Sequence, residues 1–234
     1  MWQFTHILKK ELKDYFISPI AYIVISIFLI ITGWFFFSTF FLYNQANMRG
    51  FFSLLPIIFS FVIPAITMRL FSEELNIGSY EILLTMLVTF SDIIFGKFTA
   101  GFVMTGAMLL PTLAYPISIA FIGDLDWGPV IGGYLGALLL GGAFAAIGVF
   151  ASALTHNQII AFIIGAAICF ALTLIDKMLF FFPESIVNII EYLGADFHFR
   201  NVAKGIIDSR DIIYFISVIF ISLYSTYLAL LNKE

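Results

Sequence analysis

The chain has 234 residues, of which 62% are hydrophobic and 11% are charged, and its mean hydropathy is +1.06. A soluble domain carries roughly 25% charged residues, so this chain has too little polar material to cover a folded surface in water. The formal charge of −4 gives no sign of nucleic-acid binding. The lone cysteine, Cys169, lies in an apolar stretch, which excludes a disulfide framework and a thiolate metal cluster. The composition is that of a membrane protein.

The first segment, residues 1–18, has the pattern of an amphipathic helix. Its apolar residues recur at spacings of three and four, and Lys9, Lys10 and Lys13 lie between them. A helix of this kind lies in the membrane interface rather than across the bilayer. We expect it to end at Pro19.

Uncharged stretches predict six membrane-spanning helices, because a span requires about 20 apolar residues. Their predicted bounds are 20–43, 51–68, 93–122, 129–154, 159–175 and 212–231. The third contains Pro111 and Pro116 and is long enough that we expect it to kink. Six spans place both termini on one side of the membrane, and the amino-terminal lysines place that side in the cytoplasm. The predicted fold is an all-α polytopic membrane protein, with residues 1–234 forming a single transmembrane domain.

Ionisable residues are scarce in the predicted spans. Lys97, near the start of the third span, is the exception. Ion-coupled and proton-coupled carriers bind their coupling ion through charged residues at mid-membrane depth, so this scarcity argues against a secondary transporter. The three histidines, His6, His156 and His198, fall in three different peripheral segments. We therefore expect no metal site and no catalytic residues on this chain, and predict that it is not an enzyme.

Small residues form a strip along the fourth predicted span. Such a strip is flat and allows another helix to approach closely. One row of the strip is Gly128, Gly132 and Gly136, and the adjacent row is Gly133, Ala137, Gly141 and Ala145. The fifth span has a matching row of small residues, Ala161, Gly165 and Cys169. The strip serves either helix packing within the chain or a seam between two copies.

The connection between the second and third spans, residues 69–92, is predicted to hold a short helix on the cytoplasmic side. Ser79 can act as its N-cap, Glu81 falls in its first turn, and Ser91 can cap the third span. The segment is either an interfacial linker or a rigid lever that presses into a soluble partner. As a lever, it would offer that partner Glu73, Glu74 and Glu81.

Residues 176–210, on the opposite side, contain two more amphipathic pieces that are too short to span. One begins at Pro183 and ends at Gly194. The other has an apolar stripe and a polar side, formed respectively by Phe199, Val202 and Ile206 and by Arg200, Lys204 and Asp208. These short extracytoplasmic helices either cover the ends of the spans or gate the outer mouth of a pathway.

Several stretches resemble the ABC-2 type permeases, the membrane halves of ATP-driven exporters. The residues that carry the resemblance are 9–23, at the end of the first helix, and 73–85, where an acidic pair precedes Gly-Ser-Tyr-Glu-Ile-Leu-Leu-Thr. Within that family the chain is most similar to the gliding-motility-associated ABC transporter permease, over residues 64–74, 96–98, 154–163 and 197–215. The resemblance covers essentially the whole chain.

The resemblance implies that residues 72–90 form the coupling helix, which is seated in a groove of the ATPase subunit. The ATPase-coupling positions that match the family motif are Glu73, Glu74, Gly78, Glu81, Leu84 and Thr85. Substrate-binding residues are not assigned. The chain's Gly-Lys pair, Gly96-Lys97, lacks the upstream glycine of a P-loop, so ATP and Mg²⁺ are expected on a separate ABC ATPase and no cofactor on this chain.

The function implied by the resemblance is that of a permease subunit, which couples ATP hydrolysis by the ATPase to export across the bacterial cytoplasmic membrane. A second permease half, identical or similar, is expected as a partner, with membrane lipid around the two. The sequence leaves open whether an auxiliary extracytoplasmic protein also joins the complex. The alternative is a non-transporting membrane scaffold that docks peripheral proteins. An uncharged aromatic pathway favours an amphipathic cargo, but the sequence does not specify the substrate.

Overall fold

A computed structural model describes residues 2–43, 47–78, 89–178, 183, 190–206 and 208–231. Throughout these residues the regular secondary structure is helical. The elements are α1 (Trp2–Ile17), α2 (Pro19–Tyr43), α3 (Arg49–Thr67), α4 (Arg69–Ile77), α6 (Phe90–Leu109), the 3₁₀ turn η1 (Leu110–Leu113), α7 (Ala114–Ala120), α8 (Trp127–Leu154), α9 (Gln158–Leu174), α11 (Ala195–Ala203) and α12 (Ser209–Leu231).

Within the described residues, five helical segments are long and apolar enough to cross a membrane. They are Pro19–Ser38, Arg49–Ile77, Phe90–Ala120, Trp127–Leu154 and Ser209–Leu231. The helix α9 is also apolar, but its 17 residues extend about 25 Å, against a hydrocarbon core of about 30 Å. The prediction of an all-α, multi-pass membrane protein is confirmed, whereas the sixth span stays a prediction.

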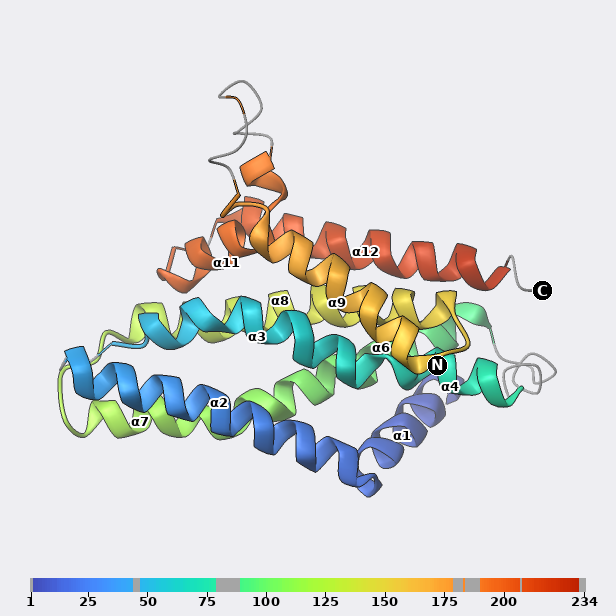
Figure 1. Ribbon diagram of the computed structural model, residues 1–234, viewed down its shortest axis with the longest axis horizontal. Coiled ribbons are helices and arrows are strands. Elements are labelled where there is room, and N and C mark those ends of the chain that lie inside the picture. Colours follow the sequence, from blue (N-terminus) through green and yellow to red (C-terminus); the bar gives the residue numbers. More distant parts are fainter. Residues whose placement is uncertain are drawn as a thin grey trace.

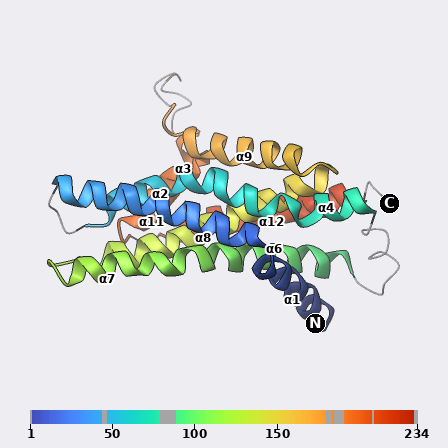
Figure 2. The same cartoon turned by 60° about the horizontal axis from the view of Figure 1, so that its bottom comes forward.

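The helix α8 lies at the centre of the bundle, as the two views in Figures 1 and 2 show. In its apolar stretch 78% of the residues are buried, against 17% in α12. The helices α3, α6, α9, α11 and α12 all pack against it. Figure 1 also shows both chain termini and α4 at one end of the bundle, while α7 and α11 lie towards the other. The described helices of the two connections predicted to face opposite sides of the membrane, α4 and α11, therefore lie towards opposite ends of the bundle.

Glycines in α8 allow its neighbours to approach closely. A Cβ atom on Gly132 would overlap the carbonyl oxygen of Val202 in α11, and one on Gly148 would overlap the hydroxyl of Thr67 in α3. On the α9 side, Gly165 approaches the backbone of Gly148. The small-residue strip therefore serves helix packing within the chain.

The predicted kink in the third span is an interruption between α6 and α7. The helix α6 ends at Leu109, and η1, which contains Pro111, separates it from α7. Proline cannot donate the helical hydrogen bond and crowds the preceding turn, so an interruption here is expected. In Figure 1 α6 runs obliquely to α7, although the two lie nearly in line in the view of Figure 2.

The predicted cap of the third span is wrong, because α6 begins one residue before Ser91. Thr89 is its N-cap: the backbone of Thr89 is extended, and its hydroxyl oxygen accepts a hydrogen bond from the amide of Asp92 at 3.2 Å. Ser91 is already inside the first helical turn, so its side chain cannot take the capping position. The predicted cap at Ser79 lies outside the described residues.

The second amphipathic piece predicted in residues 176–210 is the helix α11. Phe199 and Val202 are fully buried in it, as predicted. Ile206 is instead 66% exposed. The reason is that α11 ends at Ala203 and the chain then turns at Gly205, whose φ of 85° favours glycine. The first piece, from Pro183 to Gly194, lies mostly outside the described residues.

Candidate functional site around α4

The helix α4 has one buried face and one exposed face. Leu70, Phe71, Ser72 and Glu74 are buried, whereas Glu73, Asn76 and Ile77 are exposed. The helix ends at Gly78, which has a left-handed φ of 77° that a glycine adopts without steric cost. The exposed face of α4 therefore carries an acidic residue, Glu73, about one turn before the helix ends.

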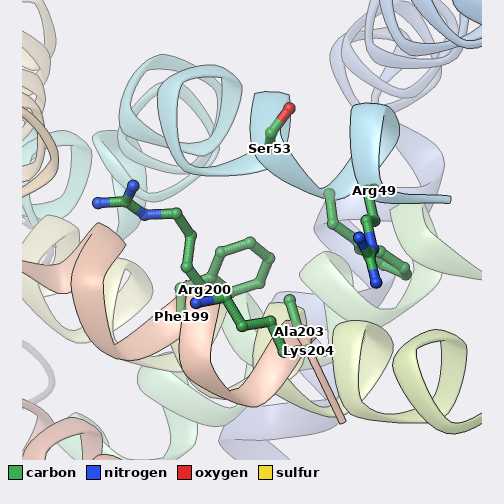
Figure 3. A pocket seen from close by; sticks show the side chains of 7 residues that line it. Arg49, Ser53, Phe199, Arg200, Ala203 and Lys204 are labelled. Carbon is green, nitrogen blue, oxygen red and sulfur yellow. The ribbon is translucent and has the colours of Figure 1, made fainter.

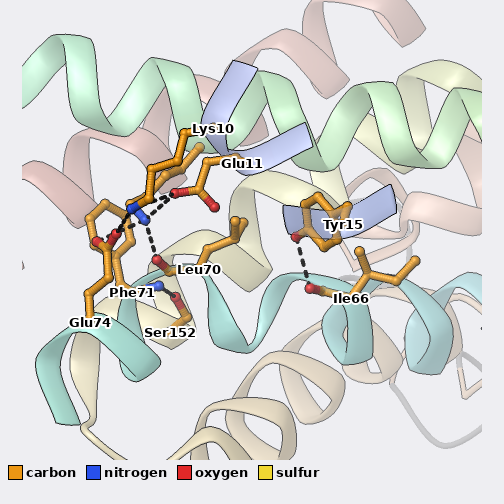
Figure 4. A network of polar contacts seen from close by, with 9 residues as sticks. Lys10, Glu11, Tyr15, Ile66, Leu70, Phe71, Glu74 and Ser152 are labelled. Atoms are coloured by element: carbon orange, nitrogen blue, oxygen red, sulfur yellow. Dashed lines mark hydrogen bonds and ion pairs between the residues drawn. The ribbon is translucent and has the colours of Figure 1, made fainter. Parts of the chain in front are cut away.

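Beneath α4 lies a cluster of four charged side chains, which we call the Lys97 cluster: Lys10, Glu11, Glu74 and Lys97 (Figure 4). The Nζ atom of Lys97 lies 2.8 Å from Oε1 of Glu11 and 2.9 Å from Oε2 of Glu74. The Nζ atom of Lys10 lies 2.9 Å from Oε1 of Glu74. Two cations thus balance two anions.

Each charged side chain in the Lys97 cluster has a partner of opposite charge on another helix. The side chain of Lys97, from α6, is 1% exposed, and a buried ammonium without a partner would be costly. Its Nζ also donates a hydrogen bond to the carbonyl of Leu70 and lies 5.1 Å from the ring centre of Phe71, a cation–π contact. The cluster therefore ties α6 to α1 and α4.

The charge on Lys10 is favoured by its surroundings. Burial alone would lower the pKa of Lys10, but the hydrogen bond to Glu74 and the charges of Glu74, Glu11 and Asp14 outweigh this effect and raise that pKa above its usual value. Lys10 consequently stays protonated over the physiological range, and the contact between α1 and α4 stays ionic.

Further polar contacts fasten the same region. The Tyr15 hydroxyl donates to the carbonyl of Ile66 at 2.9 Å, and Arg69 lies 4.6 Å over the Tyr15 ring. The amide of Phe71 donates to Oγ of Ser152 in α8 at 3.0 Å. These contacts fix α4 to α1 and α8, so α1, α4, α6 and α8 are joined at this end of the bundle.

The predicted coupling residues divide into two groups. Glu73 and Glu74 lie on α4 and Gly78 caps its end, but Glu81, Leu84 and Thr85 lie outside the described residues. Glu74 already pairs with two lysines inside the chain, so its contact with a partner stays a prediction. Sequence reasoning noted Lys97 but did not find its partners, although a lone charge in an apolar run is itself a signal that a carboxylate must face it.

A second polar cluster, which sequence reasoning also missed, lies at the opposite end of the bundle. His198, fully buried, places Nδ1 2.6 Å from Oδ1 of Asp211 and Nε2 3.0 Å from the carbonyl oxygen of Tyr192. Both ring nitrogens therefore lie within hydrogen-bonding distance of oxygen atoms. The pair joins α11 to α12.

The carboxylates at this end face two basic residues. Arg200 pairs with Asp176 and with Asp196, and Lys177 lies 3.2 Å from Asp196. Burial, and after it the charge of Asp196, raises the pKa of the Asp176 carboxyl above its usual value. Within the described part of the chain, no group of three or more His, Cys, Asp or Glu side chains could hold a metal ion.

The sequence matches no protein-family model and no curated protein. The fold and the two polar clusters define a multi-pass, all-α membrane protein, in which buried polar contacts join helices at both ends of the bundle.

Proposed function

We propose that this chain is the membrane-spanning permease subunit of an ATP-driven ABC exporter, whose ATP and Mg²⁺ are held by a separate ATPase subunit. The resemblance of residues 73–85 to the inner connection of ABC-2 type permeases supports the proposal. In it, residues 72–90 contact the ATPase, and a second permease half completes the pathway.

The observation that carries the proposal is the Lys97 cluster. An ATPase that displaces residues 79–88 acts on α4 and α6, because these two helices flank them. Separating Glu74 from Lys97 would leave buried charges without partners, which typically costs about 3–5 kcal/mol. The ion pairs therefore favour movement of α1, α4 and α6 as one unit. In this proposal, a force on the connection is transmitted to the membrane spans through that unit.

The topology of the proposal has six spans, with α9 as the fifth. The position of both termini at one end of the bundle supports this number, since an odd number of crossings would separate them (Figure 1). Lys9, Lys10 and Lys13 favour the cytoplasmic side of a bacterial inner membrane for that end. Residues 72–90 are then on the side where ATP is available.

The test is to purify the tagged chain from its native membranes in mild detergent and identify its partners by mass spectrometry. We expect an ABC ATPase at near-equal abundance, which is lost on Glu73→Lys and on Glu81→Lys. The matched control is Asp124→Lys, which makes a like charge change at an exposed position between α7 and α8, away from the Lys97 cluster. Recovery of the chain alone, or with partners that lack a P-loop, would favour the scaffold alternative.

A further inference from the structure

A pocket of about 180 Å³ lies between α3 and α11, at the end of the bundle opposite α4 (Figure 3). It is lined by Arg49, Phe52, Ser53, Phe199, Arg200, Ala203 and Lys204. Three of these side chains are cationic and none is acidic. The volume is well below the about 300 Å³ at which pockets for drug-sized ligands begin. The pocket therefore has room for a small charged group and the first atoms attached to it.

The three cations are not equivalent. Arg200 is already paired with Asp176 and Asp196. Arg49 and Lys204 are exposed, and within the described part of the chain their side chains have no ion-pair partner. Arg49 is also the first residue of α3, where the positive end of the helix dipole adds to its charge. The unbalanced charge of the pocket calls for an anion.

The wall of the pocket is apolar, and the pocket lies where a membrane-spanning segment begins. Phe52 and Phe199 are buried and form part of the wall. Arg49 is the first residue of the apolar segment Arg49–Ile77, which is long enough to cross a membrane. A charged residue at the end of such a segment is expected at the boundary where the phosphates of membrane lipids are found.

We infer that this pocket binds the phosphate group of an anionic amphiphile, with Arg49 and Lys204 contacting the phosphate and the ring of Phe199 contacting the apolar part. A lipid of the bilayer and a lipid-linked cargo share this chemistry. The bound molecule bridges α3 and α11, which pack against each other. Binding does not depend on an ATPase, so it stands whether or not the proposed transport function does.

The test uses the purified full-length chain in phosphatidylcholine nanodiscs that contain a minority of phosphatidylglycerol, with native mass spectrometry of the lipids retained after mild detergent extraction. We expect phosphatidylglycerol to be retained in preference to phosphatidylcholine. Arg49→Gln and Lys204→Gln should each weaken retention by about fivefold, the effect of removing one basic residue near an anionic headgroup. Arg49→Lys should keep most of it.

Two matched variants separate the pocket from general surface charge. Arg210→Gln removes one exposed cation at the same end of the bundle but outside this pocket, and should leave retention unchanged. Ser53→Trp leaves every charge in place but fills the pocket from an exposed position, and should abolish the preference. Equal losses for Arg49→Gln and Arg210→Gln, or no loss for Ser53→Trp, would overturn the inference.

Soluble competitors distinguish the sources of the phosphate. If an amphiphile is required, inorganic phosphate and glycerol 3-phosphate leave phosphatidylglycerol in place. Displacement of the lipid by inorganic phosphate would overturn the amphiphilic part of the inference and reassign the pocket to a free oxyanion. A cargo rather than a resident lipid is indicated if extracted native membranes yield a phosphate-linked species that displaces phosphatidylglycerol and is lost with Ser53→Trp.

Discussion

Lys97 in α6 and Glu74 in α4 form a buried ion pair, with 2.9 Å between Nζ and Oε2. Twenty-three positions separate them in the sequence, across the connection that is proposed to contact an ATPase. The two ends of that connection are thus held together inside the protein. Whatever moves the connection must move both ends together or break the pair.

Replacing Lys97 with methionine should destabilise the protein strongly. Glu11 and Glu74 would remain buried without their shared cation, and removing one partner of a buried ion pair costs about 3–5 kcal/mol. Unfolding in mixed micelles, followed by circular dichroism, measures the loss. Lys13→Met, at an exposed position on α1, is the control and should change stability little. The triple variant Lys97→Met, Glu11→Gln, Glu74→Gln should recover much of the loss, and its failure to do so would contradict an electrostatic origin.

Gly132→Ala should lower stability by about 1–3 kcal/mol, because the added methyl group meets the backbone carbonyl of Val202 and forces α11 away from α8. The same unfolding assay measures it. Gly106→Ala is the matched control, since its Cβ would have its nearest contact at 3.9 Å, on Leu138. That variant should be neutral or slightly stabilising, because alanine is the better helix former. Similar stability for the two variants would show that α11 packs less closely than described.

Thr89→Ala should destabilise the start of α6 by about 1 kcal/mol, the usual value of an N-cap hydrogen bond. Hydrogen exchange of the first-turn amides, above all that of Asp92, is the direct measurement. Ser91→Ala should leave those amides unchanged. If Ser91→Ala gave the larger increase in exchange, the cap predicted from the sequence would be restored.

The packing of α11 should strengthen as the pH falls from neutral. The pKa of Asp176 is raised in the folded protein, so the folded state holds this proton more tightly than the unfolded state. As the pH falls through this raised pKa, the free energy of unfolding therefore increases. The increase ends near pH 3.8, the usual pKa of an aspartate. Hydrogen exchange of the α11 amides, corrected for the intrinsic pH dependence, measures this effect.

Asp176→Asn is the control for this pH dependence. The variant should lose the part of the response that comes from Asp176. An identical pH response in the two proteins would exclude Asp176 as its origin.

The sequence predicts the helices better than their contacts. Long uncharged stretches identify the candidate spans because apolar length alone decides whether a helix can cross a bilayer. Prolines at 111 and 116 mark the interruption before α7 for a local reason, the missing amide. The predicted cap of α6 is wrong because Thr89 and Ser91 are both suitable N-cap residues. Which of them caps the helix depends on where the backbone becomes helical, and the sequence does not show that.

The candidate site could be predicted only in part. The acidic pair Glu73 and Glu74 is visible in the sequence. Because the two residues are adjacent in a helix, their side chains point to different faces, and Glu73 is exposed whereas Glu74 is buried. Glu11 is 86 residues from Lys97, so their pairing depends on how α1 folds back onto α6. Contacts of this range come from tertiary packing, which periodicity does not describe.

The central position of α8 determines when the bundle can form during synthesis. The helices α3 and α6 pack against α8, yet both leave the ribosome before it. Until residue 154 has entered the bilayer, their inward faces must be covered by lipid or by the insertion machinery. Helix association in membranes follows insertion, so the contacts among α1, α2, α3 and α6 can form first, those with α8 only after it is inserted, and those of α12 last.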